Sequence, residues 1–173
     1  MKARDRYDSL FRYYAETRGM PWRVLKSLAM AESSLNPDAV SRVGAQGLGQ
    51  FMKATAIWMG VKDPFDPEES IQGMAAYLSQ LFWNANAMVQ GEDDLTEEFL
   101  WRVAAASYNC GWGYAREALH QMQRDNKPMT WTIFSLYLPN VRYKGRSPKA
   151  QESLAHAEKV VPAMRSPDFF SLA

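Results

Sequence analysis

One glutamate stands where a helix would bury an apolar side chain. Within residues 21–34, Trp22, Leu25 and Leu28 recur at steps of three, which is helical spacing. Glu32 follows Leu28 by four residues and therefore shares this apolar stripe. It also falls in the last turn, where the negative end of the helix dipole disfavours an anion. Burial and the dipole both raise the pKa of a carboxyl group, so the pattern predicts a general acid.

The alternative for Glu32 is structural. A glutamate at the rim of a core commonly extends its carboxylate to water or pairs with an arginine. The residues that follow Glu32 favour chemistry, because a turn over residues 35–38 leads into a loop that contains Gly44, Gly47 and Gly49. This is not a phosphate-binding loop, since no strand precedes it and neither phosphate-loop pattern is present. We interpret the glycines as allowing backbone to approach a ligand closely, with a tight turn as the simpler alternative.

Three segments together resemble a known family. The first runs from Glu32 to Met52 and includes Leu35-Asn36-Pro37, Ser41, Gly44-Ala45, Gly47-Leu48 and Gln50. The second is Gly73-Met-Ala-Ala-Tyr77-Leu78, and the third is Ala105-Ala-Ser-Tyr108-Asn109-Cys110-Gly111. In this order they resemble the motifs of the soluble-type lytic transglycosylases and goose-type lysozymes, which cleave peptidoglycan. The resemblance covers roughly residues 20–120.

The resemblance implies an all-α, lysozyme-like fold with a substrate cleft lined by Glu32, the glycine loop and Tyr108. It implies that Glu32 is catalytic and that Ser41, Gln50 and Met52 contact substrate. Gln50 offers one donor group and an acceptor to sugar hydroxyls, and Met52 an adaptable apolar contact. A helix-start glutamine and a core methionine are the structural alternatives.

The third motif and the C-terminal region supply further candidates. The resemblance places Tyr108 near the catalytic glutamate, where its hydroxyl could stabilise the developing charge or bind an acetamido group. Asn109 either binds substrate or caps the end of its helix. Cys110 replaces the family's usual alanine and is predicted to be a buried, inert thiol. Glu152 is aligned only weakly with a peptidoglycan-contacting glutamate of the family, and an exposed helix glutamate explains it equally well.

The predicted reaction is cleavage of the β-1,4 bond between N-acetylmuramic acid and N-acetylglucosamine. Glu32 would protonate the glycosidic oxygen. Ordinary glycosidases use a second carboxylate, but Asp38, Asp63 and Asp66 are more easily read as turn or cap residues. The resemblance therefore implies that Glu32 also acts as base and that 1,6-anhydromuramic ends form. A hydrolytic goose-type lysozyme and a non-catalytic wall-binding or virion structural protein are the alternatives.

Composition limits the remaining possibilities. A chain of 173 residues is predicted to be one domain, residues 1–173. The net charge of +1 disfavours a nucleic-acid partner, and two histidines with one cysteine predict neither a metal site nor an internal disulfide. No cofactor is needed. Six tryptophans and eight tyrosines are compatible with sugar stacking or simply with a rich core. A monomer is favoured.

The predicted site of action is the bacterial cell wall. No run is long enough to span a membrane, and the N-terminus has charge without an apolar stretch, so no secretory signal is predicted. Such an enzyme would reach peptidoglycan by phage-type release, as a phage endolysin does, or as a virion component. A mature form that has lost its leader is the third alternative, which an initiating Met1 disfavours.

The other predicted elements are helical. Apolar spacing predicts helices over residues 3–18, 55–59, 96–107, 114–122 and 147–164. Asp66 as N-cap and Pro67 at the first position begin a longer helix that extends to about residue 90. Residues 131–138 are apolar without a clear period.

Overall fold

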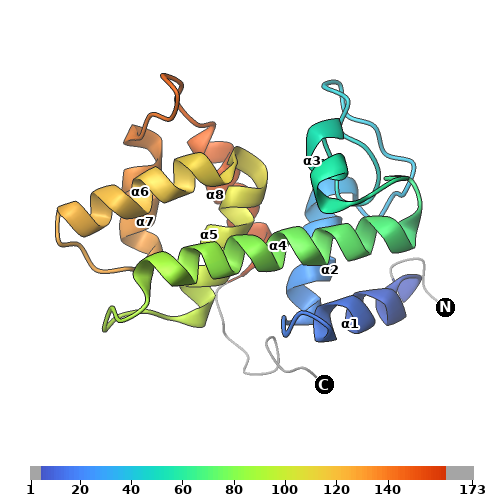
Figure 1. The fold of residues 1–173 in the computed structure, drawn as a ribbon, viewed down its shortest axis with the longest axis horizontal. Helices are drawn as coiled ribbons and strands as arrows, with labels where there is room; N and C mark the ends of the chain where they lie inside the picture. The colour runs from blue at the N-terminus through green and yellow to red at the C-terminus, as the bar shows by residue number, and fades with distance from the viewer. Residues whose placement is uncertain (1–4, 163–173) are drawn as a thin grey trace. The chain divides into compact units, whose positions relative to one another are not determined.

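The computed structural model describes residues 5–162 and is all-α over that range. In chain order its elements are α1 (Asp8–Glu16), α2 (Trp22–Ser33), α3 (Lys53–Met59), α4 (Pro67–Val89), α5 (Glu97–Cys110), α6 (Trp112–Arg124), α7 (Trp131–Tyr137), the short 3-10 helix η2 (Leu138–Asn140) and α8 (Ala150–Val160) (Figure 1). Extended pairing in the described part of the chain is limited to isolated bridges, such as that between Gln46 and Phe51. The predicted fold class is confirmed.

The chain forms two compact units that divide after Ser79. The first holds α1 to α3 and the beginning of α4, and the second holds the rest of α4 and the helices that follow. Each unit has its own apolar core, and each is described separately below.

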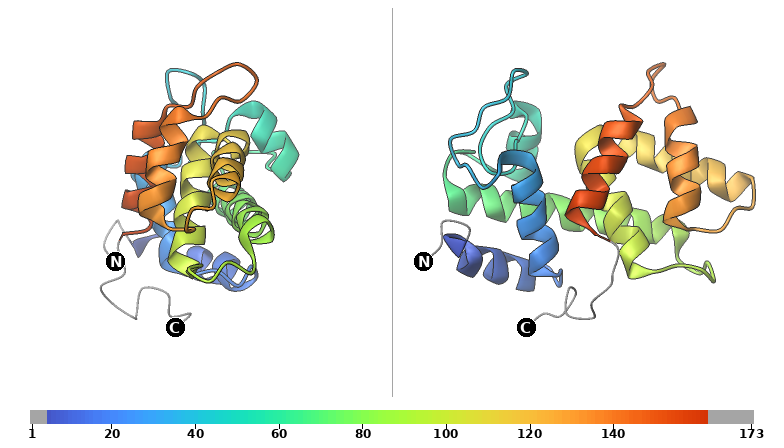
Figure 2. Two further views of the ribbon diagram at one scale, coloured as in Figure 1. Left: turned by 90° about the vertical axis from the view of Figure 1, so that its left-hand side faces the viewer. Right: turned by 180° about the vertical axis from the view of Figure 1, so that it is seen from behind.

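In the first unit, local sequence signals set the helix boundaries. Asp66 caps α4, since its carboxylate accepts a hydrogen bond from the backbone N–H of Glu69 at 2.8 Å. Gly60 ends α3 in the left-handed conformation that glycine adopts at little cost. The apolar residues of α4 within this unit, Ile71, Met74, Ala75 and Leu78, recur at steps of three and four and are almost completely buried. The loop between α2 and α3 lies beyond the C-terminal end of α2 (Figures 1 and 2).

In the second unit, α5 is the central helix. It packs against α6, α7 and α8 and is buried from Phe99 to Ser107. Ala104, Ala105 and Ala106 are fully buried, and their small side chains permit close helix packing. Thr96 caps the helix by accepting a hydrogen bond from Phe99 N–H at 3.1 Å.

Several boundaries differ from the predicted ones. α1 begins at Asp8 within the described range, and the part of the prediction at residues 3–4 lies outside it. The last helix ends at Val160, and its predicted final residues, 163 and 164, also lie outside the description. Residues 131–137 form α7 although their sequence has no clear period, because Thr130 caps the helix and Phe134 is fully buried.

No helix within residues 5–162 is both long enough and apolar enough to cross a membrane.

Candidate active site

Glu32 lies at the end of the buried stripe of α2, where its spacing places it. Leu25 and Leu28 on that stripe are fully buried, whereas Glu32, one turn further, is partly exposed. The helix ends one residue later, at Ser33. The side chain is therefore carried by a packed helix and lies at the partly exposed end of its buried stripe, where a proton donor to a large substrate could be reached.

The chain reverses immediately after Glu32. Ser34 and Leu35 both have left-handed backbone conformations, with φ of 55° and 62°. Such conformations are unfavourable for residues other than glycine and persist only where surrounding bonds enforce them. Here Ser34 N–H donates to Met30 O, and Asn36 N–H to Ser33 O. Asp38 N–H then donates to the Asn36 side chain at 3.1 Å, which forms the predicted turn.

Two of the predicted substrate contacts also close the loop. The Ser41 hydroxyl oxygen accepts from Ala45 N–H at 2.9 Å, which leaves its own proton for another acceptor. The side-chain amide of Gln50 donates to Ala39 O at 3.2 Å and to Gly47 O at 3.0 Å. Both amide hydrogens of Gln50 are used within the loop, so only its carbonyl oxygen remains to accept from a sugar hydroxyl.

Gly47 allows two segments of backbone to meet. A Cβ atom at this position would lie 1.7 Å from the carbonyl oxygen of Pro64, and its φ is +72°. The glycine interpretation from the sequence was correct about close approach but wrong about the partner at this position, which is the chain itself. Gly49 N–H anchors the same loop by donating to the buried hydroxyl of Ser70 in α4 at 3.2 Å.

Met52 precedes α3 as its N-cap residue and is 46% exposed. The core alternative for this methionine is therefore wrong, because a core side chain would be covered. A flexible thioether on the surface next to the loop is free to adapt to an apolar face of a ligand.

In the second unit, Tyr108 and Asn109 lie in the last turn of α5. The helix continues to Cys110 and is ended by Gly111, at φ 94°, so Asn109 is not the C-cap. The side-chain oxygen of Asn109 instead accepts a hydrogen bond from the Ser153 hydroxyl of α8 at 2.7 Å. This bond fixes the end of α5 to α8 and holds the Asn109 amide group in one orientation.

The second unit brings Asn109 and Glu152 to one pocket. This pocket has a volume of about 280 Å³ and is also lined by Cys110, Tyr114, Ser147, Pro148 and Lys149. Glu152 is largely exposed and pairs with Lys149 at 3.4 Å, which is the arrangement of an ordinary surface glutamate. The sequence did not single out Tyr114, which belongs to no quoted position of the family motifs, and it assigned no function to Ser153.

Cys110 is a free, partly exposed cysteine. Loss of hydration raises the pKa of its thiol to about 11, although contact with Ser153 acts in the opposite direction. The thiol is therefore protonated and weakly nucleophilic at neutral pH, as predicted for an inert residue, but the prediction that Cys110 is buried is wrong, because the residue is partly exposed.

Other carboxylates of the first unit serve turns and caps. Asp63 accepts from Phe65 N–H at 2.9 Å, and Asp66 caps α4. Glu69 accepts from the backbone N–H groups of Lys62 and Asp63 at 2.8 and 3.0 Å. The prediction that Asp63 and Asp66 are turn or cap residues is confirmed.

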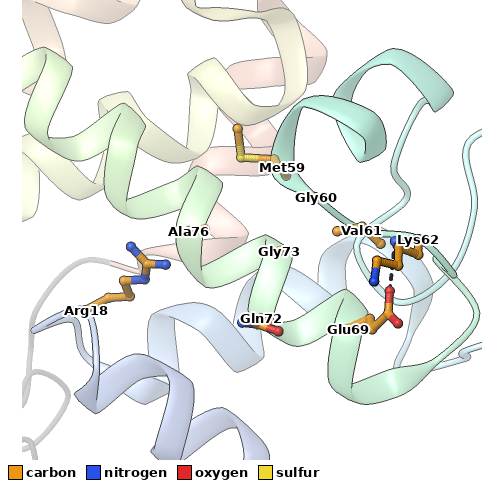
Figure 3. Close-up of a pocket in the computed structure, with 9 residues that line it drawn as sticks. All are labelled: Arg18, Met59, Gly60, Val61, Lys62, Glu69, Gln72, Gly73 and Ala76. Carbon is orange, nitrogen blue, oxygen red and sulfur yellow. Dashed lines mark hydrogen bonds between the residues drawn. The ribbon is translucent and has the colours of Figure 1, made fainter.

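A separate pocket of about 230 Å³ lies beside α4 in the first unit. It is lined by Arg18, Met59, Gly60, Val61, Lys62, Glu69, Gln72, Gly73 and Ala76 (Figure 3). The bond from Lys62 N–H to Glu69 crosses its edge. None of the predicted site residues contributes to this pocket, so its concave shape alone does not connect it with the candidate acid.

Burial of His156 gives the second unit a testable pH dependence. Loss of hydration lowers the pKa of His156 to about 4, with nearby Lys159 acting in the same direction and Glu152 against it. Because the unfolded imidazole has a pKa near 6.5, the unfolded chain binds a proton that the folded chain does not. The free energy of unfolding should therefore fall by about 3 kcal/mol as the pH drops from ~6.5 to ~4.

Urea denaturation at several pH values would measure this loss in the parent and in a His156→Gln variant. The variant should lose less stability on acidification than the parent does. His120→Gln is the matched control, because His120 is exposed, and it should keep the parent's pH dependence. Equal acid sensitivity in the parent and the His156 variant would contradict the assignment.

Comparison with protein families matches residues 9–129 to the transglycosylase SLT domain. The chain belongs to this family. The match spans the candidate acid, the glycine loop and the third motif, so the family inferred from the sequence is confirmed. Similar proteins include membrane-bound lytic murein transglycosylase F of Serratia proteamaculans, 39% identical over 146 residues, and that of Marinobacter nauticus, 36% identical over 142 residues.

Two solved structures share the fold of this SLT-domain chain. An inactive glutamate-to-glutamine mutant of the lytic transglycosylase Slt from Pseudomonas aeruginosa superposes with a TM-score of 0.65 at 21% identity, covering 91% of this chain and 23% of its own. The 70 kDa soluble lytic transglycosylase of Escherichia coli gives a TM-score of 0.63 at 22% identity, covering 89% and 22%. The expected lysozyme-like helical domain of this family is thereby found.

The SLT-domain chain spans little more than a quarter of the length of these curated relatives. The aligned segment covers 83% of this chain but 28% of the Serratia protein, and 80% but 27% of the Marinobacter protein. Both relatives are bacterial, so they lend no support to the phage origin considered from the sequence.

Proposed function

We propose that this SLT-domain chain is a peptidoglycan lytic transglycosylase that acts on the bacterial cell wall. Its substrate would be the glycan strand, and it would cleave the β-1,4 bond between N-acetylmuramic acid and N-acetylglucosamine. The observation that carries the proposal is the partly exposed Glu32 at the end of the buried stripe of α2, inside the segment that matches the family. The names of the curated relatives and of the structurally similar proteins support the same activity.

Glu32 would act twice in the reaction. Its protonated carboxyl group first donates the proton to the glycosidic oxygen, and the bond to C1 of the muramic acid breaks through an oxocarbenium-like state. The ionised carboxylate then takes the proton from the 6-hydroxyl group of the same sugar, whose oxygen attacks C1. The 1,6-anhydro ring closes, the proton returns to Glu32, and no water enters the products.

Three carboxylates before and at the start of α4 support a mechanism with one acid. Asp63, Asp66 and Glu69 accept hydrogen bonds from backbone N–H groups that end turns or begin α4. A carboxylate held in this way points at nearby backbone N–H groups, which suits a cap better than a nucleophile. Glu32 would therefore serve as both acid and base.

The remaining predicted residues would bind the glycan strand. In the first unit, the Ser41 hydroxyl and the Gln50 carbonyl oxygen offer one donor and one acceptor beside the exposed Met52. In the second unit, Tyr108 would bind or stabilise the reacting sugar, and Asn109 with Glu152 would contact substrate at the 280 Å³ pocket. Glu152 has the weakest support, because its ion pair with Lys149 accounts for it without substrate.

Mass spectrometry of the reaction products tests the proposal. Purified peptidoglycan is digested with the full chain, and the soluble fragments are weighed. We expect muropeptides that end in 1,6-anhydromuramic acid, because the 6-hydroxyl group replaces water as the nucleophile. Reducing-end fragments heavier by one water would identify a hydrolase of the goose-type lysozyme kind. Absence of fragments from folded protein on several wall types would favour a wall-binding or structural protein.

A further inference from the structure

The apolar residues exposed in the first unit gather in one part of the chain. Apart from Tyr13, the large apolar side chains that the described residues of this unit expose are Val40, Val43, Met52, Ile57 and Trp58. All five lie in the loop after Glu32 or in the helix that ends this loop, α3. Burial of an exposed tryptophan would gain free energy, so such exposure in the segment that directly follows the candidate acid in the sequence is a candidate ligand contact.

Trp58 is the member of this group best suited to hold a ligand. Its side chain is 60% exposed, although it sits on a short helix whose inner face is anchored by the buried Ala56. Its ring meets Tyr77 of α4 edge to face, with centroids 5.7 Å apart and planes at 73°. Tyr77 belongs to the second family motif. This contact orders the indole ring before any ligand arrives, which lowers the entropy cost of binding.

The chemistry of the exposed ring suits a sugar. A pyranose presents axial C–H groups on one face, and these pack against the flat, electron-rich face of an indole. The glycan strand proposed as substrate consists of such rings and extends on both sides of the bond that is cleaved. We propose that Trp58 is a stacking platform for an N-acetylhexosamine ring of the strand outside the two sugars that react, an inference that rests on the proposed function.

A glycan fits this surface better than a lipid bilayer does. Helices that lie on membranes present a long apolar face flanked by several cations. α3 has only seven residues, and its one cation is Lys53. In the sequence, the exposed group begins within the loop that carries Ser41 and Gln50 and ends in α3, so a strand bound at the loop would have further sugar rings for the helix that follows it.

The test measures binding separately from cleavage. All variants carry Glu32→Gln in the full chain, and the affinity for tetra-N-acetylchitotetraose is measured by calorimetry. We expect Trp58→Ala to weaken binding about tenfold and Trp58→Phe to retain most of it, because a smaller aromatic face remains. With Glu32 intact, Trp58→Ala should raise KM for peptidoglycan about tenfold at nearly unchanged kcat.

The matched control is Trp83→Ala. Trp83 is 59% exposed, and its ring meets that of Phe82 edge to face with centroids 5.4 Å apart. It is therefore as exposed as Trp58 and, like Trp58, has one aromatic ring against its edge. It lies in the second unit and outside the exposed group described here. Its replacement should leave both affinity and KM within twofold of the parent.

Several results would overturn the platform. The first is an unchanged affinity for the tetrasaccharide in Trp58→Ala. The second is a loss of affinity in Trp83→Ala equal to that in Trp58→Ala. The third is no binding of the tetrasaccharide by the protein that carries Glu32→Gln alone. A vesicle assay tests the membrane alternative. If the parent sediments with phosphatidylcholine–phosphatidylglycerol vesicles and Trp58→Ala does not, at unchanged glycan affinity, Trp58 would be a membrane contact instead. The binding test is independent of the reaction, because affinity is measured without turnover. Products other than anhydro sugars would refute the proposed reaction but would leave the measured effect of Trp58 on glycan affinity unchanged.

Discussion

Glu32→Gln should abolish nearly all release of soluble fragments from peptidoglycan. The change keeps the size and polarity of the side chain but removes the proton that the leaving oxygen needs and the base that the second step needs. General acid–base catalysis by one side chain is typically worth 10²–10⁴-fold. Since the proposed mechanism uses this carboxyl group in both steps, we expect a loss of at least about a thousandfold in kcat. Affinity for the tetrasaccharide should change little.

The matched control for this experiment is Glu16→Gln. Glu16 is exposed and stands at the C-terminal end of α1, as Glu32 stands near the end of α2. Its activity should stay within twofold of the parent, and both variants should keep the parent's melting temperature within a few degrees. A Glu32→Gln variant that retains a tenth or more of the parental rate would remove the residue from the chemistry and direct attention to another acid.

Local sequence rules predicted much of the scaffold that positions this acid. Trp22, Leu25 and Leu28 at steps of three identify the buried stripe of α2, and this stripe places Glu32, four residues after Leu28, without any knowledge of the fold. Asp66 and Pro67 together mark the start of α4, because a capping carboxylate and a proline at the first position act within a few residues of each other. Such signals are readable since cause and effect lie close together in the sequence.

Contacts between distant residues could not be predicted in this way. One of the two interpretations of Asn109 was a helix cap, yet α5 continues past it to Cys110, and its side chain is bound to Ser153, 44 residues further along the chain. Gln50 was assigned two polar functions toward substrate, but the loop folds back and uses its amide hydrogens internally. α7 lacks a clear apolar period, so its existence depends on the packing of Phe134 rather than on a pattern.

Gly47→Ala should destabilise the protein severely, for a reason that no local pattern contains. The new methyl group would lie 1.7 Å from the carbonyl oxygen of Pro64, and backbone cannot move aside as the end of a flexible side chain can. The left-handed backbone alone costs a residue other than glycine on the order of 1 kcal/mol. Together we expect a loss of about 3 kcal/mol or more in the free energy of unfolding, or roughly 10 °C in melting temperature.

Gly44→Ala separates the two causes of that loss. Gly44 also has a left-handed conformation, with φ of +85°, but a Cβ atom there would meet nothing within 4 Å. Its replacement by alanine should therefore cost only the conformational part, about 1 kcal/mol. Thermal melting of both variants makes the comparison. If the two alanine variants have the same melting temperature, the close approach of Gly47 to Pro64 contributes nothing to stability. Backbone conformation alone would then explain the glycines at positions 44 and 47. If Gly47→Ala is much the worse, the loop beside Glu32 depends on its contact with the Pro64 segment, since that contact is the feature Gly44 lacks.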